Sequence, residues 1–300
     1  MENIDTLKHS ANLSPRYKLA NANVYVSPEI GYHYIDYLDP LDDFVSKAKT
    51  IKLTQEKILH IEKSLQSNYK RFEEHVKHLN RQDSIKGMKV LDIGCGGGLF
   101  LSLAEKQGAH VTGLELSESR IQYLKLKYDF DVVKQSIESA YWQKFYYHYD
   151  FVTLWDVIEH VNYPLSTLQS AAKVLKQGGY LLIDTPCRDS FYHRVGELTY
   201  KFTKGRFPTF LNTMYSAQNF GHKQIFSTNE MKLLFEASGL EVIELNKVHE
   251  LAFPYRYYLK KLFKSDLVIN LLLPLVHIFF TIFKIKNKMV IVGEKKSKEE

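Results

Sequence analysis

The sequence contains a glycine-rich segment that is suited to holding a ligand with its backbone. Four glycines and Cys95 make up Gly94–Gly98, which follows the apolar run Val90–Ile93 directly. Glycine lets a backbone approach a ligand where a Cβ would clash, and a helix that begins after such a turn directs free N–H groups at the ligand. This pattern predicts a site for a nucleotide-like molecule.

The spacing of the glycines argues against a dinucleotide. The fingerprint G-x-G-x-x-G has a third glycine for close helix packing, but that position is Leu99 counted from Gly94 and Leu101 counted from Gly96. Glu115 ends a second apolar run, 21 residues after Gly94, where its two oxygens can accept both hydroxyls of a ribose. Because many nucleotide cofactors carry a ribose, Glu115 supports the site without choosing the ligand.

An alternation of apolar runs and helical patterns predicts the scaffold that positions these residues. Strands are expected at Lys89–Ile93, His110–Leu114, Asp131–Gln135, Phe151–Trp155, Tyr180–Asp184, Glu241–Leu245 and Met289–Gly293. Helices are expected at 99–107, 117–127, 138–145 and 164–175, and another begins at the capping-box sequence Ser227–Glu230. Strands that alternate with helices are typical of an α/β fold with a mostly parallel sheet.

Four segments together resemble the class I S-adenosylmethionine-dependent methyltransferases. These are LDIGCGGG (91–98), the strand-terminal Glu115, YDFVTLWDVIEHV (149–161) and VLKQGGYLLIDTP (174–186). Over residues 85–250 the chain is similar to the subgroup of ubiquinone-biosynthesis O-methyltransferases and polysaccharide-cluster methyltransferases. The resemblance implies a three-layer, Rossmann-like α/β fold whose last strand is antiparallel, with S-adenosylmethionine as the cofactor.

The resemblance also implies cofactor-binding roles at the positions that match the family motif. Asp92, Gly94, Gly96 and Gly98 would line the methionine and ribose end of the cofactor, and Glu115 would bind the ribose. From the residues alone, Asp92 has the simpler alternative role of capping the turn.

Further along the chain, the resemblance implies that Leu116 lies beside the adenine. Glu138 is a cofactor-binding candidate at the same end, where Ser136 replaces the acid more usual in the family, and its alternative is a helix-start residue. Trp155 and Asp156 end the fourth strand, beside the crevice where ligands of open α/β sheets bind. For Trp155 the alternative is an ordinary core residue.

Methyl transfer to a hydroxyl requires alignment of the acceptor and removal of its proton. His160 and His222 are the candidates for the general base, with a solvated helix start as the alternative for His160. The sequence shows no zinc-type Cys/His spacing, so no metal site is predicted.

We expect O-methylation of a small apolar, lipid-linked or glycan acceptor. The alternatives are C- or N-methylation of a small metabolite, or a non-catalytic cofactor-binding partner that docks on a membrane enzyme.

The chain divides into an N-terminal part, 1–84, and a methyltransferase domain, 85–300. The first 50 residues show little periodicity and predict an irregular arm, whereas apolar positions three and four apart predict a long amphipathic helix at 54–80. Residues 186–226 hold nine aromatic side chains in 41 residues and predict a lid over the substrate.

The net charge of +6 is concentrated near the C-terminus. Within the predicted insertion 250–288, basic residues at 256–264 and 284–288 flank the apolar run Leu267–Phe283. A helix of these 17 residues is about 25 Å long, shorter than a hydrocarbon core of about 30 Å. The pattern favours contact of 256–288 with an anionic membrane surface rather than with nucleic acid, and the alternative is packing on the domain or in a dimer.

Two cysteines cannot form a disulfide framework, and the N-terminus lacks the apolar core of a secretion signal. We therefore expect a cytoplasmic protein, peripheral on the inner face of the membrane if 256–288 binds lipid. The sequence does not determine the oligomeric state.

Overall fold

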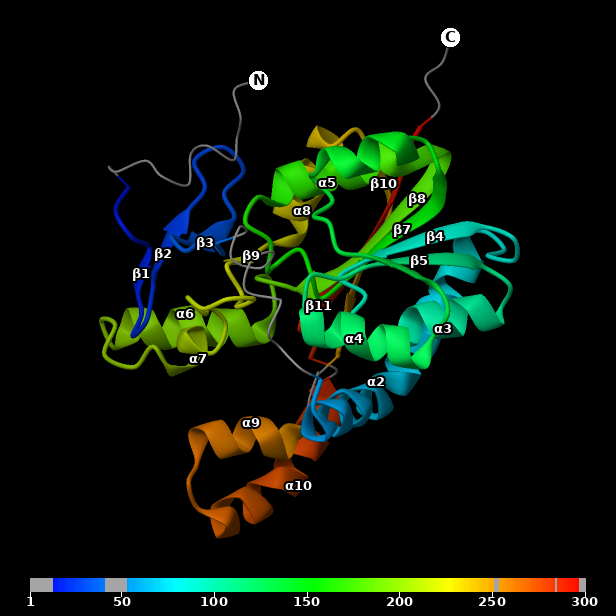
Figure 1. Cartoon of the computed structure of the whole chain (residues 1–300). Coiled ribbons are helices and arrows are strands. Elements are labelled where there is room, and N and C mark those ends of the chain that lie inside the picture. The colour runs from blue at the N-terminus through cyan, green and yellow to red at the C-terminus, as the bar shows by residue number, and fades with distance from the viewer. Residues whose placement is uncertain (1–12, 41–52, 251–253, 284, 297–300) are drawn as a thin grey trace.

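The computed structural model describes residues 13–40, 53–250, 254–283 and 285–296. Its centre is a seven-stranded sheet, drawn in Figure 1. In spatial order its strands are β10 (Glu241–Val248), β11 (Lys288–Glu294), β8 (Leu175–Pro186), β7 (Tyr149–Trp155), β4 (Lys89–Ile93), β5 (His110–Leu114) and β6 (Asp131–Val133). The strands from β8 to β6 are parallel, and β11 is antiparallel to both of its neighbours. The predicted α/β fold with an antiparallel last strand is confirmed.

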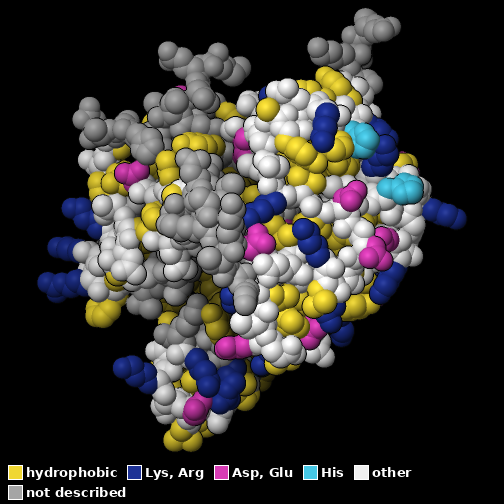
Figure 2. All heavy atoms as spheres, viewed as in Figure 1, with side chains coloured by type: hydrophobic (Ala, Val, Ile, Leu, Met, Phe, Trp, Pro, Cys, Tyr) yellow, Lys and Arg dark blue, Asp and Glu magenta, His cyan; other side chains and the backbone are white. Residues whose placement is uncertain are grey.

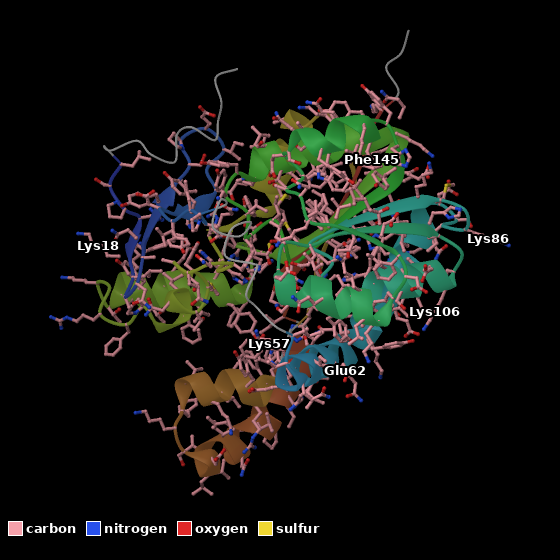
Figure 3. The ribbon with its side chains drawn as sticks, viewed as in Figure 1. Lys18, Lys57, Glu62, Lys86, Lys106 and Phe145 are labelled. Atoms are coloured by element: carbon pink, nitrogen blue, oxygen red, sulfur yellow. The ribbon has the colours of Figure 1, made fainter. Side chains whose placement is uncertain are left out.

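Helices cover both faces of this sheet. On one face lie α2 (Gln55–Gln82), α3 (Leu99–Lys106) and α4 (Glu118–Lys127), and on the other lie α5 (Pro164–Val174) and α8 (Thr228–Ala237). The short 3₁₀ helix η3 (Ala140–Phe145) packs against α5. The predicted helix at 138–145 is therefore a single short 3₁₀ segment. Phe145 lies near α5, whereas Lys86 and Lys106 point outward at the periphery (Figure 3).

Local sequence signals explain where several of these helices begin. The hydroxyl of Ser227 accepts from the backbone N–H of Glu230, and the Glu230 carboxylate accepts from the backbone N–H of Ser227, which completes the predicted capping box of α8. Pro164 opens α5, where its missing N–H has no helical partner in any case. Thr54 caps the long helix α2, which buries Val76 and Leu79 against the domain.

A second, smaller sheet corrects the expectation of an irregular arm. The strands β1 (Tyr17–Lys18), β2 (Asn23–Val26), β3 (His33–Ile35) and β9 (Gln224–Ile225) form an antiparallel sheet in this order. The parts of the predicted arm at 1–12 and 41–52 lie outside the described residues. The arm was mispredicted because its strands have two to four residues each, too few for a period-2 pattern to stand out.

The predicted lid folds together with this small sheet. It contains α6 (Phe191–Phe202), α7 (Thr209–Asn212) and β9, and it shares one hydrophobic cluster with the N-terminal strands. The buried members of this cluster are Tyr17, Val24, Ile35, Leu211, Tyr215 and Ile225. The N-terminal strands and the lid are therefore one structural unit beside the main sheet (Figure 1).

The predicted insertion forms a helical hairpin, α9 (Tyr255–Leu262) and α10 (Asp266–Phe283), between β10 and β11. It projects from the domain at the end of α2 (Figure 1). Among the described residues, α10 is the one helix that is long and apolar enough to cross a membrane by length and composition.

Candidate functional site

The glycine turn after β4 adopts a conformation that only glycine accommodates easily. The φ angles of Gly94, Gly96 and Gly98 are +73°, +58° and +78°. A Cβ on Gly94 would lie 2.6 Å from a methyl of Val157. At Gly96, in contrast, the nearest atom to a Cβ would be Arg120 Nη1 at 3.8 Å, an ordinary contact distance, and Gly96 lines the pocket. The turn is thus fixed by packing on one side and presents its backbone to the pocket on the other.

Glu115 is fixed at the rim of this turn by backbone N–H groups. One carboxylate oxygen accepts from Gly96 N at 2.9 Å, and the other accepts from Leu116 N at 2.9 Å and Ser117 N at 2.8 Å. The guanidinium of Arg120 lies 3.6 Å from Oε2, so a cation as well as backbone donors surrounds this carboxylate. The side chain lies directly after β5 and beside the glycine turn, as expected, and its contact with a ribose stays a prediction.

Asp92 lies buried beneath the turn, and among the described residues no cation pairs with it. Its carboxylate accepts from the Thr153 hydroxyl at 2.7 Å. Burial raises its pKa well above the usual value, and the nearby carboxylates of Glu115 and Asp184 add to this effect. An uncompensated buried carboxyl at a pocket wall favours a cationic ligand, because such a ligand restores the ionised form.

Leu116 and Glu138 lie farther along the same pocket. Leu116 is half-buried and packs against the core. The exposed Glu138 accepts hydrogen bonds from Thr167 Oγ1 at 2.5 Å and from Ser136. The carboxylate of Glu138 therefore already has two partners within the protein.

Trp155 forms part of the pocket wall. Its ring stacks on the His75 ring of α2 with centroids 4.0 Å apart and an angle of 2° between the planes, and it meets Phe100 edge-on at 5.3 Å. Its indole N–H is buried without a hydrogen-bond partner among the described residues. This unpaired donor is a feature that a bound ligand would satisfy.

Asp156 has a different environment from the one expected for a cofactor ligand. Its backbone has a φ of +52°, which is rare for a residue with a side chain, and its N–H donates to Asp184 Oδ1 at 2.7 Å. Its carboxylate lies 2.5 Å from Lys288 Nζ and 2.6 Å from Arg71 Nη2. The carboxylate is therefore engaged with two cations of the protein.

These contacts belong to an ionic cluster that the sequence did not predict. Besides Asp156, Arg71 lies 2.6 Å from Asp184 and 3.0 Å from Glu250, and Lys288 lies 2.8 Å and 3.1 Å from the same two residues. Burial opposes the ionisation of Asp184, but the charges of Lys288 and Arg71 outweigh it and hold its pKa well below the usual value. The cluster fastens α2, the ends of β7 and β8, and β11 to one another.

Sequence signals for this cluster existed, but none identified the partners. Asp184 interrupts the apolar strand YLLIDTP, and Arg71 lies between the apolar stripe residues Tyr69 and Phe72 of α2. The chain positions of Arg71 and Lys288 are too far apart for any local pattern to pair them.

The two predicted base candidates, His160 and His222, lie side by side in the same pocket as Gly96 and Glu115. Their ring centroids are 4.6 Å apart in an edge-on arrangement. Burial lowers the pKa of His160 and of His222 below the ordinary value of 6.5. Both imidazoles are therefore neutral near pH 7 and competent to take up a proton.

Backbone and side-chain hydrogen bonds bring this pair together. Lys223 N donates to the carbonyl of Glu159 at 2.8 Å, and Lys223 Nζ donates to the carbonyl of His160 at 2.6 Å. Gln224 Nε2 donates to Ile158 O at 2.9 Å and to Val161 O at 2.7 Å. The segment that carries His222 is thereby joined to the turn that carries His160.

Glu159 completes a polar group beside the histidines. Its Oε1 lies 3.9 Å from His160 Nε2, and its Oε2 accepts from Thr185 Oγ1 at 3.0 Å. Burial raises the pKa of Glu159 to about 7. Glu159, His160 and His222 offer ligand atoms within 4.8 Å of one another, a grouping that could hold a metal ion and that sequence spacing alone did not indicate.

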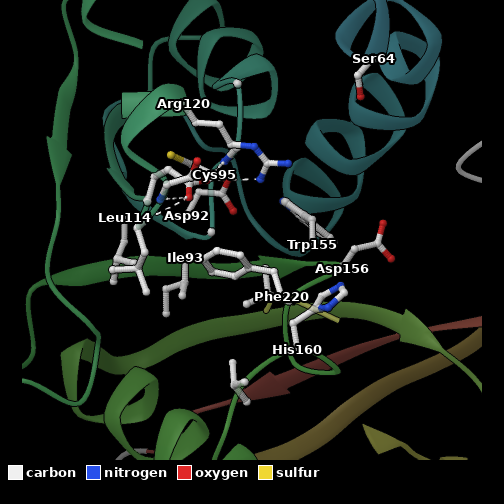
Figure 4. A pocket seen from close by; sticks show the side chains of 18 of the residues that line it. Ser64, Asp92, Ile93, Cys95, Leu114, Arg120, Trp155, Asp156, His160 and Phe220 are labelled. Atoms are coloured by element: carbon white, nitrogen blue, oxygen red, sulfur yellow. Dashed lines mark hydrogen bonds and ion pairs between the residues drawn. The ribbon is translucent and has the colours of Figure 1, made fainter. Parts of the chain in front are cut away.

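The pocket thus has two ends. Figure 4 shows Asp92 and Arg120 on one side, beside the glycine turn, and Trp155, Asp156 and His160 on the other. The buried carboxyl of Asp92, the carboxylate of Glu115 and the glycine turn fit a cationic, ribose-bearing molecule such as S-adenosylmethionine.

Solved structures with low sequence identity share this fold. A chain in the complex of the Haloferax volcanii Trm112 methyltransferase activator aligns with a TM-score of 0.56 at 15% identity, covering 87% of this chain and 100% of that one. A Galdieria sulphuraria protein described as a sarcosine dimethylglycine methyltransferase aligns with a TM-score of 0.50 at 16% identity. The alignment covers 86% of this chain and 99% of that one.

Curated sequences and a family profile agree with the structural likeness. The ubiquinone biosynthesis O-methyltransferase of Erwinia tasmaniensis is 37% identical over 109 residues, 35% of this chain and 44% of that protein. The Vibrio cholerae protein of the same name is 34% identical over 112 residues, which are 36% of this chain and 45% of that protein. The aligned part of the chain covers less than half the length of each of these relatives. The profile of the methyltransferase domain matches residues 60–245, more than half of the chain. The chain therefore belongs to the methyltransferase-domain family, of the class I S-adenosylmethionine-dependent type.

Proposed function

We propose that this protein methylates a hydroxyl group of a small acceptor. The observation that carries the proposal is the neutral pair His160 and His222, which lies in the same pocket as the cofactor-binding turn. When bound, S-adenosylmethionine supplies an electrophilic methyl group on a sulfonium, and the products are the methylated acceptor and S-adenosylhomocysteine. The relatives named as O-methyltransferases support oxygen as the methylated atom.

The residues of the chain have separate tasks in this reaction. The glycine turn and Glu115 orient the sugar end of the cofactor, and the ionised form of Asp92 offsets a positive charge nearby. His160 or His222 takes the proton of the acceptor hydroxyl as the oxygen attacks the methyl carbon. Bound S-adenosylmethionine would supply the methyl group and leave as S-adenosylhomocysteine, and the proton would end on the imidazole.

The lining of the pocket supports an acceptor with an apolar body. Leu65 and Phe72 of α2, Phe220 of the lid and Tyr258 of α9 contribute to the walls. An aromatic hydroxyl suits an imidazole base better than a sugar alcohol does, because a phenol loses its proton more readily. A lipid-linked phenol is therefore the acceptor class that we favour, with a lipid-linked glycan as the second choice.

Calorimetric titration followed by a turnover assay tests the proposal. The full chain is titrated with S-adenosylmethionine, and formation of S-adenosylhomocysteine is then measured with an isoprenoid-tailed catechol, a glycan alcohol and a small amine. Turnover with the catechol and a methyl ether product support the proposal. Turnover with the amine, or a carbon-methylated product, identifies N- or C-methylation instead. Cofactor binding without turnover on any of these acceptors would favour a non-catalytic cofactor-binding partner.

A further inference from the structure

We propose that the α9–α10 hairpin and the outward face of α6 form one surface that seats the protein on an anionic lipid bilayer. We call this surface the apolar platform. Its exposed apolar side chains are Phe191, Leu198, Phe202, Leu267, Leu271, Leu275, Ile278, Ile282 and Phe283.

The helix α10 leaves most of its apolar surface uncovered. Leu267, Leu271 and Leu275 are 71%, 67% and 62% exposed, and Ile269 is its one buried residue among those described. An apolar face of this length is rarely left in water by a monomeric protein, because covering it removes a large area of hydrocarbon from solvent. Packing on its own domain, the simplest alternative, is not what the structure shows.

The pairing of β10 with β11 restricts how α10 can contact a bilayer. Val248, at the end of β10, pairs with Lys288, at the start of β11, so the chain leaves the sheet and returns to it at the same place. A single crossing by α10 would put β10 and β11 on opposite sides of the membrane and break this ladder. The helix therefore lies along the bilayer surface, with its apolar side turned into the interface.

Aromatic contacts join α6 to the hairpin. The Phe191 ring lies 6.3 Å from the Phe279 ring, and Tyr192 stacks on Phe280 at 5.5 Å. Phe191, Leu198 and Phe202 are spaced seven and four residues apart, so they share one face of α6. Phe202 is 82% exposed. The lid helix thus extends the apolar platform beyond the hairpin.

The charges around the platform favour an anionic lipid surface as the partner. Cations border it: Arg256 is half-buried, and the exposed ones are Lys260, Lys264, Lys201, Lys204 and Arg206. Asp266 is the one acidic residue of the described hairpin segment, and it lies 2.8 Å from the guanidinium of Arg256. Figure 2 shows the hairpin lobe, below α2, with basic side chains gathered beside apolar ones. An anionic bilayer complements both features, because it takes up apolar side chains and attracts the cations beside them. A second copy docking through the same surface would bring two sets of cations together.

The platform borders the mouth of the pocket. Tyr258 of α9 and Asn287, at the base of the hairpin, both line the pocket. An acceptor held in the bilayer by an apolar tail would therefore reach the pocket from the side of the platform. This last step rests on the proposed function, whereas the binding of lipid does not.

Flotation of the full chain with phosphatidylcholine vesicles, with and without phosphatidylglycerol, tests the proposal. We expect the chain to float with the anionic vesicles and to be released by salt. Leu275→Glu should weaken binding about tenfold or more, since it places a charge where an apolar side chain enters the interface. Phe202→Glu should weaken binding as well, and unchanged binding of this variant would overturn the inclusion of α6 in the platform. The matched control is Leu126→Glu on α4, because Leu126 is 63% exposed but lies outside the platform.

Three outcomes would overturn the proposal. They are failure to bind either vesicle, equal binding of the Leu275→Glu and Leu126→Glu variants, and a concentration-dependent dimer that Leu275→Glu abolishes, which would assign the surface to a second copy. Calorimetry with S-adenosylmethionine on each variant shows that the fold is intact. It also separates loss of lipid binding from failure of the proposed methyl transfer.

Discussion

The imidazole of His222 lies edge-on against the imidazole of His160, with ring centroids 4.6 Å apart. The ammonium of the neighbouring Lys223 donates to the carbonyl of His160 at 2.6 Å, so the two histidines are held as a unit. Burial keeps both rings neutral near pH 7 by lowering their pKa values. A half-buried neutral pair at the wall of a ligand pocket is well placed to receive a proton.

Removing the base should reduce turnover and alter its pH dependence. We expect His160→Gln or His222→Gln to lower kcat by about 10²–10⁴-fold, with the larger loss at the residue that accepts the proton. In the wild type, kcat/KM should fall only as the pH drops below 6.5, because the histidines protonate below their ordinary pKa. The variant that lacks the base should lose this acidic limb.

Steady-state turnover from pH 5 to 8 provides the measurement for the histidine variants. Unchanged kcat and an unchanged pH profile in both variants would exclude a histidine base. A parallel assay with a chelator examines the grouping of Glu159 with the two histidines, since loss of turnover that added Mg²⁺ restores would indicate metal assistance.

Glu115 should control cofactor affinity. Glu115→Gln preserves the size of the side chain but removes its charge and places an amide donor against backbone N–H groups. Hydrogen bonds to charged groups contribute about 1.5–3 kcal/mol, so we expect the Kd for S-adenosylmethionine to rise roughly 10–100-fold. Calorimetry measures the change. Asp131→Asn, an exposed acid at the start of β6, is the control and should bind as the wild type does.

Two glycines with the same backbone angle separate conformational strain from steric clash. Gly98 and Gly87 both have a φ of +78°, but a Cβ on Gly98 would lie 2.5 Å from Leu124 Cδ2, whereas a Cβ on Gly87 would meet nothing within 4 Å. Both Ala variants should lose about 1–2 kcal/mol of unfolding free energy from the left-handed backbone. Gly98→Ala should lose about 1–3 kcal/mol more from overpacking.

Urea unfolding of the two glycine variants provides the comparison. Equal destabilisation would show that Leu124 moves aside without cost. We also expect Gly98→Ala, but not Gly87→Ala, to weaken binding of S-adenosylmethionine, since Gly98 belongs to the turn that forms the pocket.

The ionic cluster should contribute strongly to stability. Lys288→Met leaves Asp156, Asp184 and Glu250 with Arg71 as the remaining cation of the cluster, and loss of one partner of a buried ion pair costs about 3–5 kcal/mol. Urea unfolding measures the loss. Lys286→Met is the matched control, because Lys286 is exposed two residues away and should change stability little. Similar values for both variants would contradict this role of the cluster.

The same substitution should change the acid dependence of stability. The pKa of Asp184 is lowered in the folded state, so its contribution is present above the ordinary value of 3.8 and is lost as the pH falls through the lower folded value. Without Lys288 the folded pKa rises, and the Lys288→Met variant should lose stability at a higher pH than the wild type. Urea unfolding at a series of acidic pH values tests this order.

The sequence by itself predicted the order of strands and helices and the position of the cofactor turn. The apolar runs at Lys89–Ile93 and the later strands, together with the capping box at Ser227, are local signals, because each depends on residues only a few positions apart. The predicted position of Glu115 at the end of β5 follows from the same kind of pattern.

Only the tertiary structure decided which distant residues meet. Local patterns carry no information on partners such as Arg71 and Lys288, which converge on Asp184 from α2 and β11. They also missed the pairing of β3 with β9, because strands this short gain stability from neighbours rather than from their own pattern. The apolar run at Leu267–Phe283 was visible in the sequence, but its exposure depends on whether the rest of the fold covers it. Because Val248 pairs with Lys288, the segment that contains α10 leaves and re-enters the sheet at the same place. The rest of the fold therefore leaves most of α10 uncovered.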